Sequence, residues 1–75
     1  MIRMITTSFE NDTLVGTTKE NISLEVYKNI KESIKVFMNA GGKEYPEYDS
    51  RKRLKRLTSV SPNGSYRTIR TFRFE

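Results

Sequence analysis

The middle of the chain carries apolar residues every three or four positions: Ile22, Val26, Ile30, Ile34 and Phe37. This is the period of one face of an α-helix, and most lysines and glutamates of the segment fall on the other side. Thr17 and Glu20 form a capping-box pattern, and Gly41 with Gly42 favours a helix end. The pattern therefore predicts one long amphipathic helix within residues 17–41.

The segments on either side of this helix have different patterns. Residues 2–9 are rich in isoleucine, threonine and phenylalanine, which favours a strand. The polar residues that follow favour a turn and a short return strand, so residues 1–16 are expected to form an N-terminal strand and turn. Pro46 bars a central strand. We therefore expect residues 42–50 to be a linker or an edge segment.

Residues 51–75 predict a β-hairpin. Pro62 suits the first corner of a type I turn and Gly64 suits the left-handed position after it, which gives a three-residue loop at 62–64. The resulting register aligns three apolar pairs: Val60–Tyr66, Leu57–Ile69 and Leu54–Phe72. A two-residue Asn-Gly turn would give a second register, with the pairs Val60–Arg67 and Leu57–Arg70.

The favoured register also sets arginine against arginine, with Arg56 opposite Arg70 and Arg53 opposite Arg73. Like charges that face each other across a sheet destabilise it. A bound anion between the strands would remove this cost, so the register points to a negatively charged ligand.

These elements follow one another in the order β(β)αββ and fit in one domain, residues 1–75. The expected fold class is α+β, with the helix packed on a small antiparallel sheet that ends in the C-terminal hairpin. The chain has no cysteine or histidine, which excludes disulfides and leaves the usual zinc sites without ligands. Extra stability would have to come from packing or self-association, which leaves a homodimer open.

The net charge is +5, and its distribution is uneven. Basic and acidic residues balance over residues 1–42, whereas residues 51–73 contain eight basic residues and no acidic one. The eight are Arg51, Lys52, Arg53, Lys55, Arg56, Arg67, Arg70 and Arg73. We predict that they bind the phosphates of DNA or RNA, or an acidic partner protein. Lysines on an edge strand also prevent stray strand pairing, which is the structural alternative.

Three aromatic residues of the hairpin, Tyr66, Phe72 and Phe74, share one strand face by alternation. They could stack on bases, but a core this small needs aromatic side chains, which favours packing against the helix. Residues 43–48 hold two tyrosines, two glutamates and one proline, and we expect a packed loop there, with a docking segment as the alternative.

The predicted function is that of a small basic nucleic-acid-binding protein. The alternative is a non-enzymatic inhibitor or adaptor, of the kind made by viruses or mobile elements, that docks on an acidic protein. The lack of histidine and cysteine argues against an enzyme and leaves only a ribonuclease that works through Arg, Lys and Tyr. No cofactor, metal or membrane partner is expected. The N-terminus has no apolar signal core, so a cytoplasmic location is expected.

Overall fold

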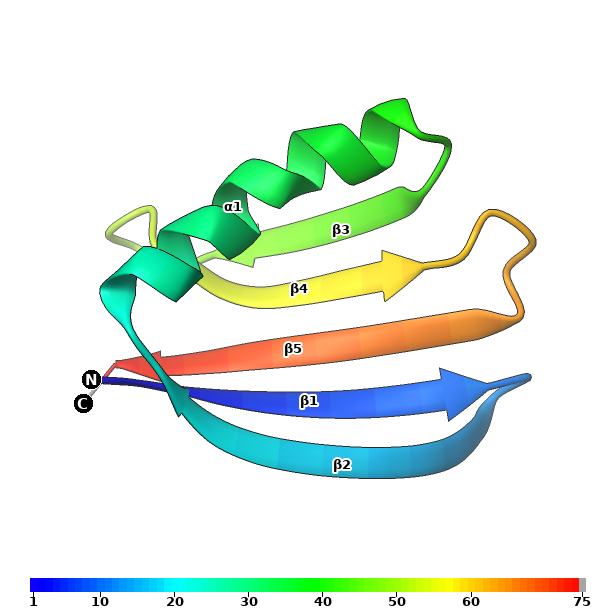
Figure 1. The fold of residues 1–75 in the computed structure, drawn as a ribbon, viewed down its shortest axis with the longest axis horizontal. Helices are drawn as coiled ribbons and strands as arrows, with labels where there is room; N and C mark the ends of the chain where they lie inside the picture. The colour runs from blue at the N-terminus through cyan, green and yellow to red at the C-terminus, as the bar shows by residue number, and fades with distance from the viewer. Residues whose placement is uncertain (75) are drawn as a thin grey trace.

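The computed structural model describes residues 1–74 and shows a five-stranded antiparallel sheet with one helix on one of its faces (Figure 1). The elements are β1 (Ile2–Glu10), β2 (Thr13–Ile22), α1 (Leu24–Asn39), β3 (Lys43–Tyr48), β4 (Leu54–Val60) and β5 (Tyr66–Phe74). Their order across the sheet is β2-β1-β5-β4-β3. The α+β class predicted from the sequence is confirmed, with a longer β2 and an additional strand, β3.

The sheet consists of the β1–β2 hairpin and the three-stranded meander β3–β4–β5, joined by pairing of β1 with β5. β1 pairs with β5 along its whole length, from Ile2 opposite Phe74 to Glu10 opposite Tyr66. The start of β1 and the end of β5 therefore lie side by side (Figure 1). Because this pairing joins the two ends of the chain, residues far apart in sequence share a surface.

The β1–β2 hairpin turns on Asn11 and Asp12, which both have positive φ angles of 50° and 65°. Asparagine and aspartate tolerate this conformation better than most residues, and two such residues suit a tight hairpin turn. β2 then continues to Ile22, so the helix predicted from residue 17 begins too early. Pairing with β1 overrides the local Thr17–Glu20 capping pattern, and the threonine-rich segment favours this outcome.

Helix α1 begins after Ser23, whose Oγ accepts a hydrogen bond from the Val26 N–H at 3.2 Å. Its predicted end at the two glycines is confirmed. Gly41 has a φ of +91°, and the Gly42 N–H donates to the Phe37 carbonyl at 2.8 Å. A Cβ at Gly42 would lie 2.9 Å from that carbonyl oxygen, so the close approach requires glycine.

Residues 43–48 are not a linker, because they form β3 and pair with β4 at an edge of the sheet. Pro46 has no N–H to donate and is compatible with an edge strand. The prediction of an edge segment is therefore correct, whereas the predicted linker and packed loop are wrong.

The core lies between α1 and one end of the sheet, and consists of Ile2, Met4, Ile22, Tyr27, Ile34, Leu54, Leu57 and Phe72, with Ile30 and Phe74 packed against it. Tyr27 lies at its centre, with its ring 5.3 Å from the rings of both Phe72 and Phe74 in edge-to-face arrangement. Its hydroxyl donates to the Leu54 carbonyl at 2.9 Å. Phe72 and Phe74 thus pack against the helix as expected, whereas Tyr66 is 45% exposed.

The buried face of α1 differs from the predicted apolar stripe. Tyr27, Ile30 and Ile34 pack into the core, whereas Val26 and Phe37 are 43% and 50% exposed. Ile22, which began the predicted stripe, is buried but belongs to β2. Ile30 and Ile34 of the predicted stripe thus pack into the core together with Tyr27, whereas Val26 and Phe37 do not.

The favoured register of the C-terminal hairpin is wrong by one residue. Its loop contains four residues, 62–65, and is closed by a hydrogen bond from the Ser61 N–H to the Tyr66 carbonyl at 2.9 Å. Gly64 has the expected left-handed φ, +77°. Ser65 joins the loop because its N–H and Oγ bond to Oδ1 of Asn63. The observed pairs are those of the second register, with Val60 opposite Arg67 and Leu57 opposite Arg70.

Candidate functional site

The sheet has one face that no element of residues 1–74 covers, because α1 packs on the other. Side chains alternate between the two faces along each strand. Phe72 faces α1 and is buried, so its neighbours Thr71 and Arg73 point to the uncovered side. We call this surface the open face.

The open face carries six basic residues and one acidic residue, as the strand registers show. The basic residues are Arg3, Lys19, Lys43, Arg56, Arg67 and Arg73, and the acidic residue is Glu47. Three of the eight residues predicted from residues 51–73 are among them: Arg56, Arg67 and Arg73. The other three come from β1, β2 and β3, which sequence analysis did not assign to the site.

Arg3 and Arg73 lie directly opposite each other on β1 and β5. Asn21 of β2 is the next residue in this row, so the row contains no carboxylate between β2 and β5. The next row on this face has Lys19 and Arg56 at its ends. Lys19 lies opposite Ile5, and Arg56 lies opposite Thr71, so each is diagonal to the Arg3–Arg73 pair. Opposed arginines therefore occur in this sheet, although neither of the two predicted pairs does.

Two of the open-face arginines have partners within the sheet. Arg56 makes an ion pair with Glu47, with 3.5 Å between Nη1 and Oε2. The guanidinium of Arg67 lies over the ring of Phe9, with its Cζ 4.6 Å from the ring centroid, and its Nη1 is 4.0 Å from Oδ1 of Asp12. Such cation–π contacts hold a guanidinium flat against a ring. Arg67 is thus preorganised. Arg3 and Arg73 make no ion pair with another of residues 1–74.

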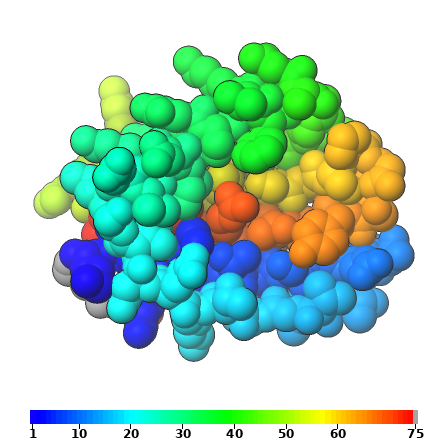
Figure 2. Space-filling view, in the orientation of Figure 1, coloured from blue at the N-terminus to red at the C-terminus, as the bar shows by residue number. Residues whose placement is uncertain are grey.

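Arg70 lies on the opposite surface, facing the α1 side of the sheet. It lines a hollow beside the C-terminal part of α1, with Phe37, Glu44 and Tyr66. Figure 2 shows β5 exposed there, between the helix and the N-terminal hairpin. The favoured register placed an anion between Arg56 and Arg70. The two residues lie on opposite faces of the sheet and cannot bind one anion together.

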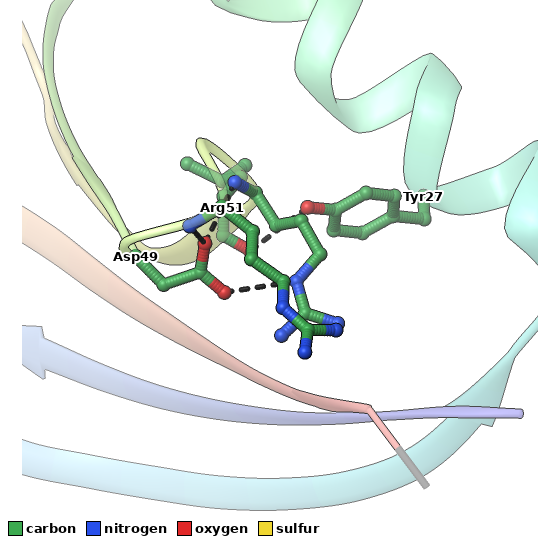
Figure 3. Close-up of polar contacts among 5 residues, drawn as sticks. Tyr27, Asp49 and Arg51 are labelled. Carbon is green, nitrogen blue, oxygen red and sulfur yellow. Dashed lines mark hydrogen bonds and ion pairs between the residues drawn. The ribbon is translucent and has the colours of Figure 1, made fainter.

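The turn before β4 holds Arg51, Lys52 and Arg53. Its geometry depends on Asp49, whose Oδ1 accepts hydrogen bonds from the N–H groups of Arg51 and Arg53, both at 2.9 Å (Figure 3). Asp49 Oδ2 accepts from the Arg53 Nε at 2.9 Å. The bond from the Arg53 N–H, together with these contacts, lowers the pKa of Asp49 below its ordinary value.

Arg53 packs against the rest of the protein and is not available on the open face. Its guanidinium lies over the ring of Phe74, with Cζ 4.3 Å from the centroid, and covers the rim of the core. Arg51, Lys52 and Lys55 are exposed, and Lys52 adopts a positive φ of 61° in the turn. The eight predicted residues therefore fall into three groups: the open face, the turn with its adjoining bulge at Lys55, and the α1 side.

Comparisons with protein-family models, curated proteins and solved structures find no match. In residues 1–74, no group of three or more acidic side chains is arranged to hold a metal ion. The helix of this described part is not long and apolar enough to cross a bilayer. The surface chemistry of the sheet is thus the basis for assigning a function.

Proposed function

We propose that this protein binds nucleic acid, DNA or RNA, through the open face of its sheet. The observation that supports this most directly is the Arg3–Arg73 pair. Like charges directly opposite each other destabilise a sheet by about 0.2–1 kcal/mol. A phosphate between the two guanidinium groups would convert this repulsion into charge-assisted hydrogen bonds.

Lys19 and Arg56 extend the positive charge on either side of this pair. Because the four residues come from four neighbouring strands, they form a band across the sheet rather than a run along one strand. A band of this kind suits a polyanion that crosses the strands. Basic residues that neutralise several phosphates supply most of the affinity of non-specific nucleic-acid binding.

The centre of the open face is suited to close approach of a flat ligand. It consists of β-branched side chains, among them Thr7, Ile69 and Thr58, which form one row across β1, β5 and β4. Tyr45 of β3 ends this row and is 55% exposed. An exposed tyrosine beside basic residues can stack on a base, so the surface offers contacts to both backbone and bases.

The test is a binding titration with single-stranded and duplex DNA and RNA over a range of salt concentrations. For duplex DNA, log affinity should fall linearly with log salt, with a slope of about −0.9 for each phosphate neutralised. Replacing both Arg3→Gln and Arg73→Gln should reduce the magnitude of this slope by about 2. The absence of binding to every probe at low salt would contradict the proposal.

Two control variants separate the open face from net charge. Lys28→Gln with Lys35→Gln removes the same charge from exposed positions of α1. Arg70→Gln removes one arginine from β5 on the side of the sheet facing α1. We expect both to retain nearly the full salt slope. A loss in either control as large as in the Arg3/Arg73 variant would show that the open face is not the binding surface.

A second candidate function is binding of an acidic protein through the same face. The half-buried apolar side chains there, Ile5, Phe9, Val60 and Ile69, favour it, because protein interfaces combine an apolar centre with a charged rim. A pull-down from nuclease-treated extract distinguishes the two functions. One defined partner that survives nuclease and is lost with Arg3→Gln/Arg73→Gln supports this alternative, whereas loss of all partners after nuclease supports nucleic acid.

A further inference from the structure

The two edges of the sheet differ in how well they are protected against further strand pairing. β3, at one edge, has six residues and contains Pro46 and two glutamates. Short length, proline and charge are among the usual means by which proteins block an edge. β2, at the other edge, has ten residues and no proline, and its only charged residues are Lys19 and Glu20. Its bulge, at Val15, lies outside residues 17–22.

The β2 edge offers backbone groups for pairing over its regular part, residues 17–22. At the end of the β1–β5 ladder the Asn11 N–H donates to the Ser65 carbonyl, so odd-numbered residues of β1 bond to β5 and even-numbered ones to β2. The β2 residues that bond back to β1 are therefore also even-numbered. The N–H and C=O groups of Thr17, Lys19 and Asn21 consequently point outward.

Apolar features at the two ends of β2 complement each other. Near the β1–β2 turn, Leu14 and Val15 are 57% and 53% exposed. At the other end, Met1, Ile22, Leu24 and Phe74 line most of a hollow of about 500 Å³. Antiparallel pairing of two β2 strands brings the start of β2 in each copy next to the end of β2 in the other. Each copy would then place its Leu14–Val15 segment beside the hollow of its partner.

We propose that β2 pairs with β2 of a second copy of this chain, with a two-fold axis at Thr18. A second copy fits better than an unrelated peptide because the strand carries both the apolar projection and the hollow that receives it. Such self-complementarity is the property of a two-fold interface. This inference concerns the free protein and does not depend on the proposed function.

The position of the axis follows from charge and from the apolar ends. An axis at Lys19 would set two lysines directly opposite each other, which is unfavourable. An axis at Thr17 would set Lys19 opposite Val15 and move Val15 away from the hollow. An axis at Thr18 instead pairs Thr17 with Lys19 and Gly16 with Glu20. It brings the bulge at Val15 close to Asn21, which lines the hollow.

The dimer would have a ten-stranded sheet with both helices on one side. A two-fold axis perpendicular to the sheet keeps like faces together. The two open faces would therefore join into one continuous basic surface, with Lys19 of each copy close to the seam. Two copies of the Arg3–Arg73 pair would lie on this surface.

Single-cysteine variants test the axis directly, because the chain has no cysteine of its own. Thr18 lies opposite itself in a non-hydrogen-bonded pair, where Cα atoms are about 4.5 Å apart, within the usual range for a disulfide. Thr18→Cys should therefore form a covalent dimer of twice 8.8 kDa under mild oxidation. Thr17→Cys, equally exposed and one residue away, should cross-link at least about tenfold more slowly because its two copies are offset. Faster cross-linking of the Thr17 variant would overturn the proposed register.

The solution mass of the unmodified chain gives the second test, measured by sedimentation or light scattering in nuclease-free, nucleic-acid-free buffer. We expect a mass that rises with concentration toward twice 8.8 kDa. Thr18→Lys, which sets lysine against lysine at the axis, should raise the dimer dissociation constant about fivefold or more. Ser50→Lys adds the same charge in a remote turn and should leave it unchanged. A mass of 8.8 kDa at every concentration would overturn the dimer.

A third pair of variants tests the apolar ends. Val15→Lys removes the projecting side chain and should weaken dimerisation about tenfold or more, since it sets a charge against an apolar hollow. Val36→Lys makes the same change at a position of α1 that is 65% exposed, away from β2. Equal effects of the two substitutions would contradict the interface. Circular dichroism of each variant shows whether the monomer fold is intact.

Discussion

Phe72 and Arg73 are neighbours on β5, yet their environments have little in common. Phe72 is 4% exposed and touches the ring of Tyr27, whereas Arg73 points to the open face and lies opposite Arg3. The same contrast holds across the sheet. Leu57 is 1% exposed on the α1 side, and the adjacent Arg56 is on the open face, paired with Glu47.

This comparison shows how a chain of 75 residues can be both stable and strongly basic. Alternation along a strand separates the two demands, because one set of side chains makes the core and the other carries charge. The core occupies only the end of the sheet that α1 packs on. On the same face but outside the core, Tyr66 is exposed and Arg70 lines an open hollow. Substitutions on the two faces should consequently have very different effects on stability.

The largest difference is expected for apolar truncation. Leu57→Ala should reduce the free energy of unfolding by about 2–5 kcal/mol, because it leaves a cavity among fully buried side chains. Ile69→Ala, on the half-buried open face, should cost about 1 kcal/mol or less. Urea unfolding measures both values. Similar losses at the two positions would mean that the open face is covered in the free protein, by a second copy or another partner.

A smaller effect is expected from the polar contact at the centre of the core. Tyr27→Phe leaves the Leu54 carbonyl without its donor and should reduce stability by about 1–3 kcal/mol. Tyr48→Phe is the matched control, since Tyr48 is 51% exposed and should change stability by less than about 0.5 kcal/mol.

The same hydroxyl predicts a dependence on alkaline pH. Burial raises the pKa of Tyr27 above its ordinary value. The unfolded chain therefore releases this proton first, near pH 10. The stability contributed by the protonated hydroxyl is fully present below about pH 10 and is lost as pH rises toward the raised pKa. Unfolding measured from pH 8 to pH 11 should show a steeper loss for the natural chain than for Tyr27→Phe. Parallel curves would contradict the assignment.

The fold was predictable from sequence where local chemistry decides it. The end of α1 follows from Gly41 and Gly42, and the C-terminal hairpin follows from Pro62 and Gly64. The start of α1 was not predictable in this way, because Ile22 falls at helical spacing from the helix residues but pairs with Ile2 in the sheet. Residues whose partner is distant in sequence are the ones that local patterns misassign.

The candidate site was predictable in composition but not in arrangement. A one-residue error in the register moves every side chain opposite a different partner. Ser65 caused this error by joining the loop through its bonds to Asn63. Arg3 could not have been found by extending the basic segment, since it reaches Arg73 only through β1–β5 pairing of the two ends of the chain.

The smallest predicted effect tests whether the Arg3–Arg73 pair costs stability. Arg3→Gln or Arg73→Gln alone should each raise the free energy of unfolding by about 0.3 kcal/mol in low salt, because either one removes the repulsion. The double variant should gain no more than one single variant, since the two residues act as one pair. Added salt should shrink the gain, as it screens exposed charges. Gains that add up, or a loss of stability, would show that the two guanidinium groups do not repel each other. In that case stability would give no reason for an anion to bind between them, and the proposed function would depend on the salt titration alone.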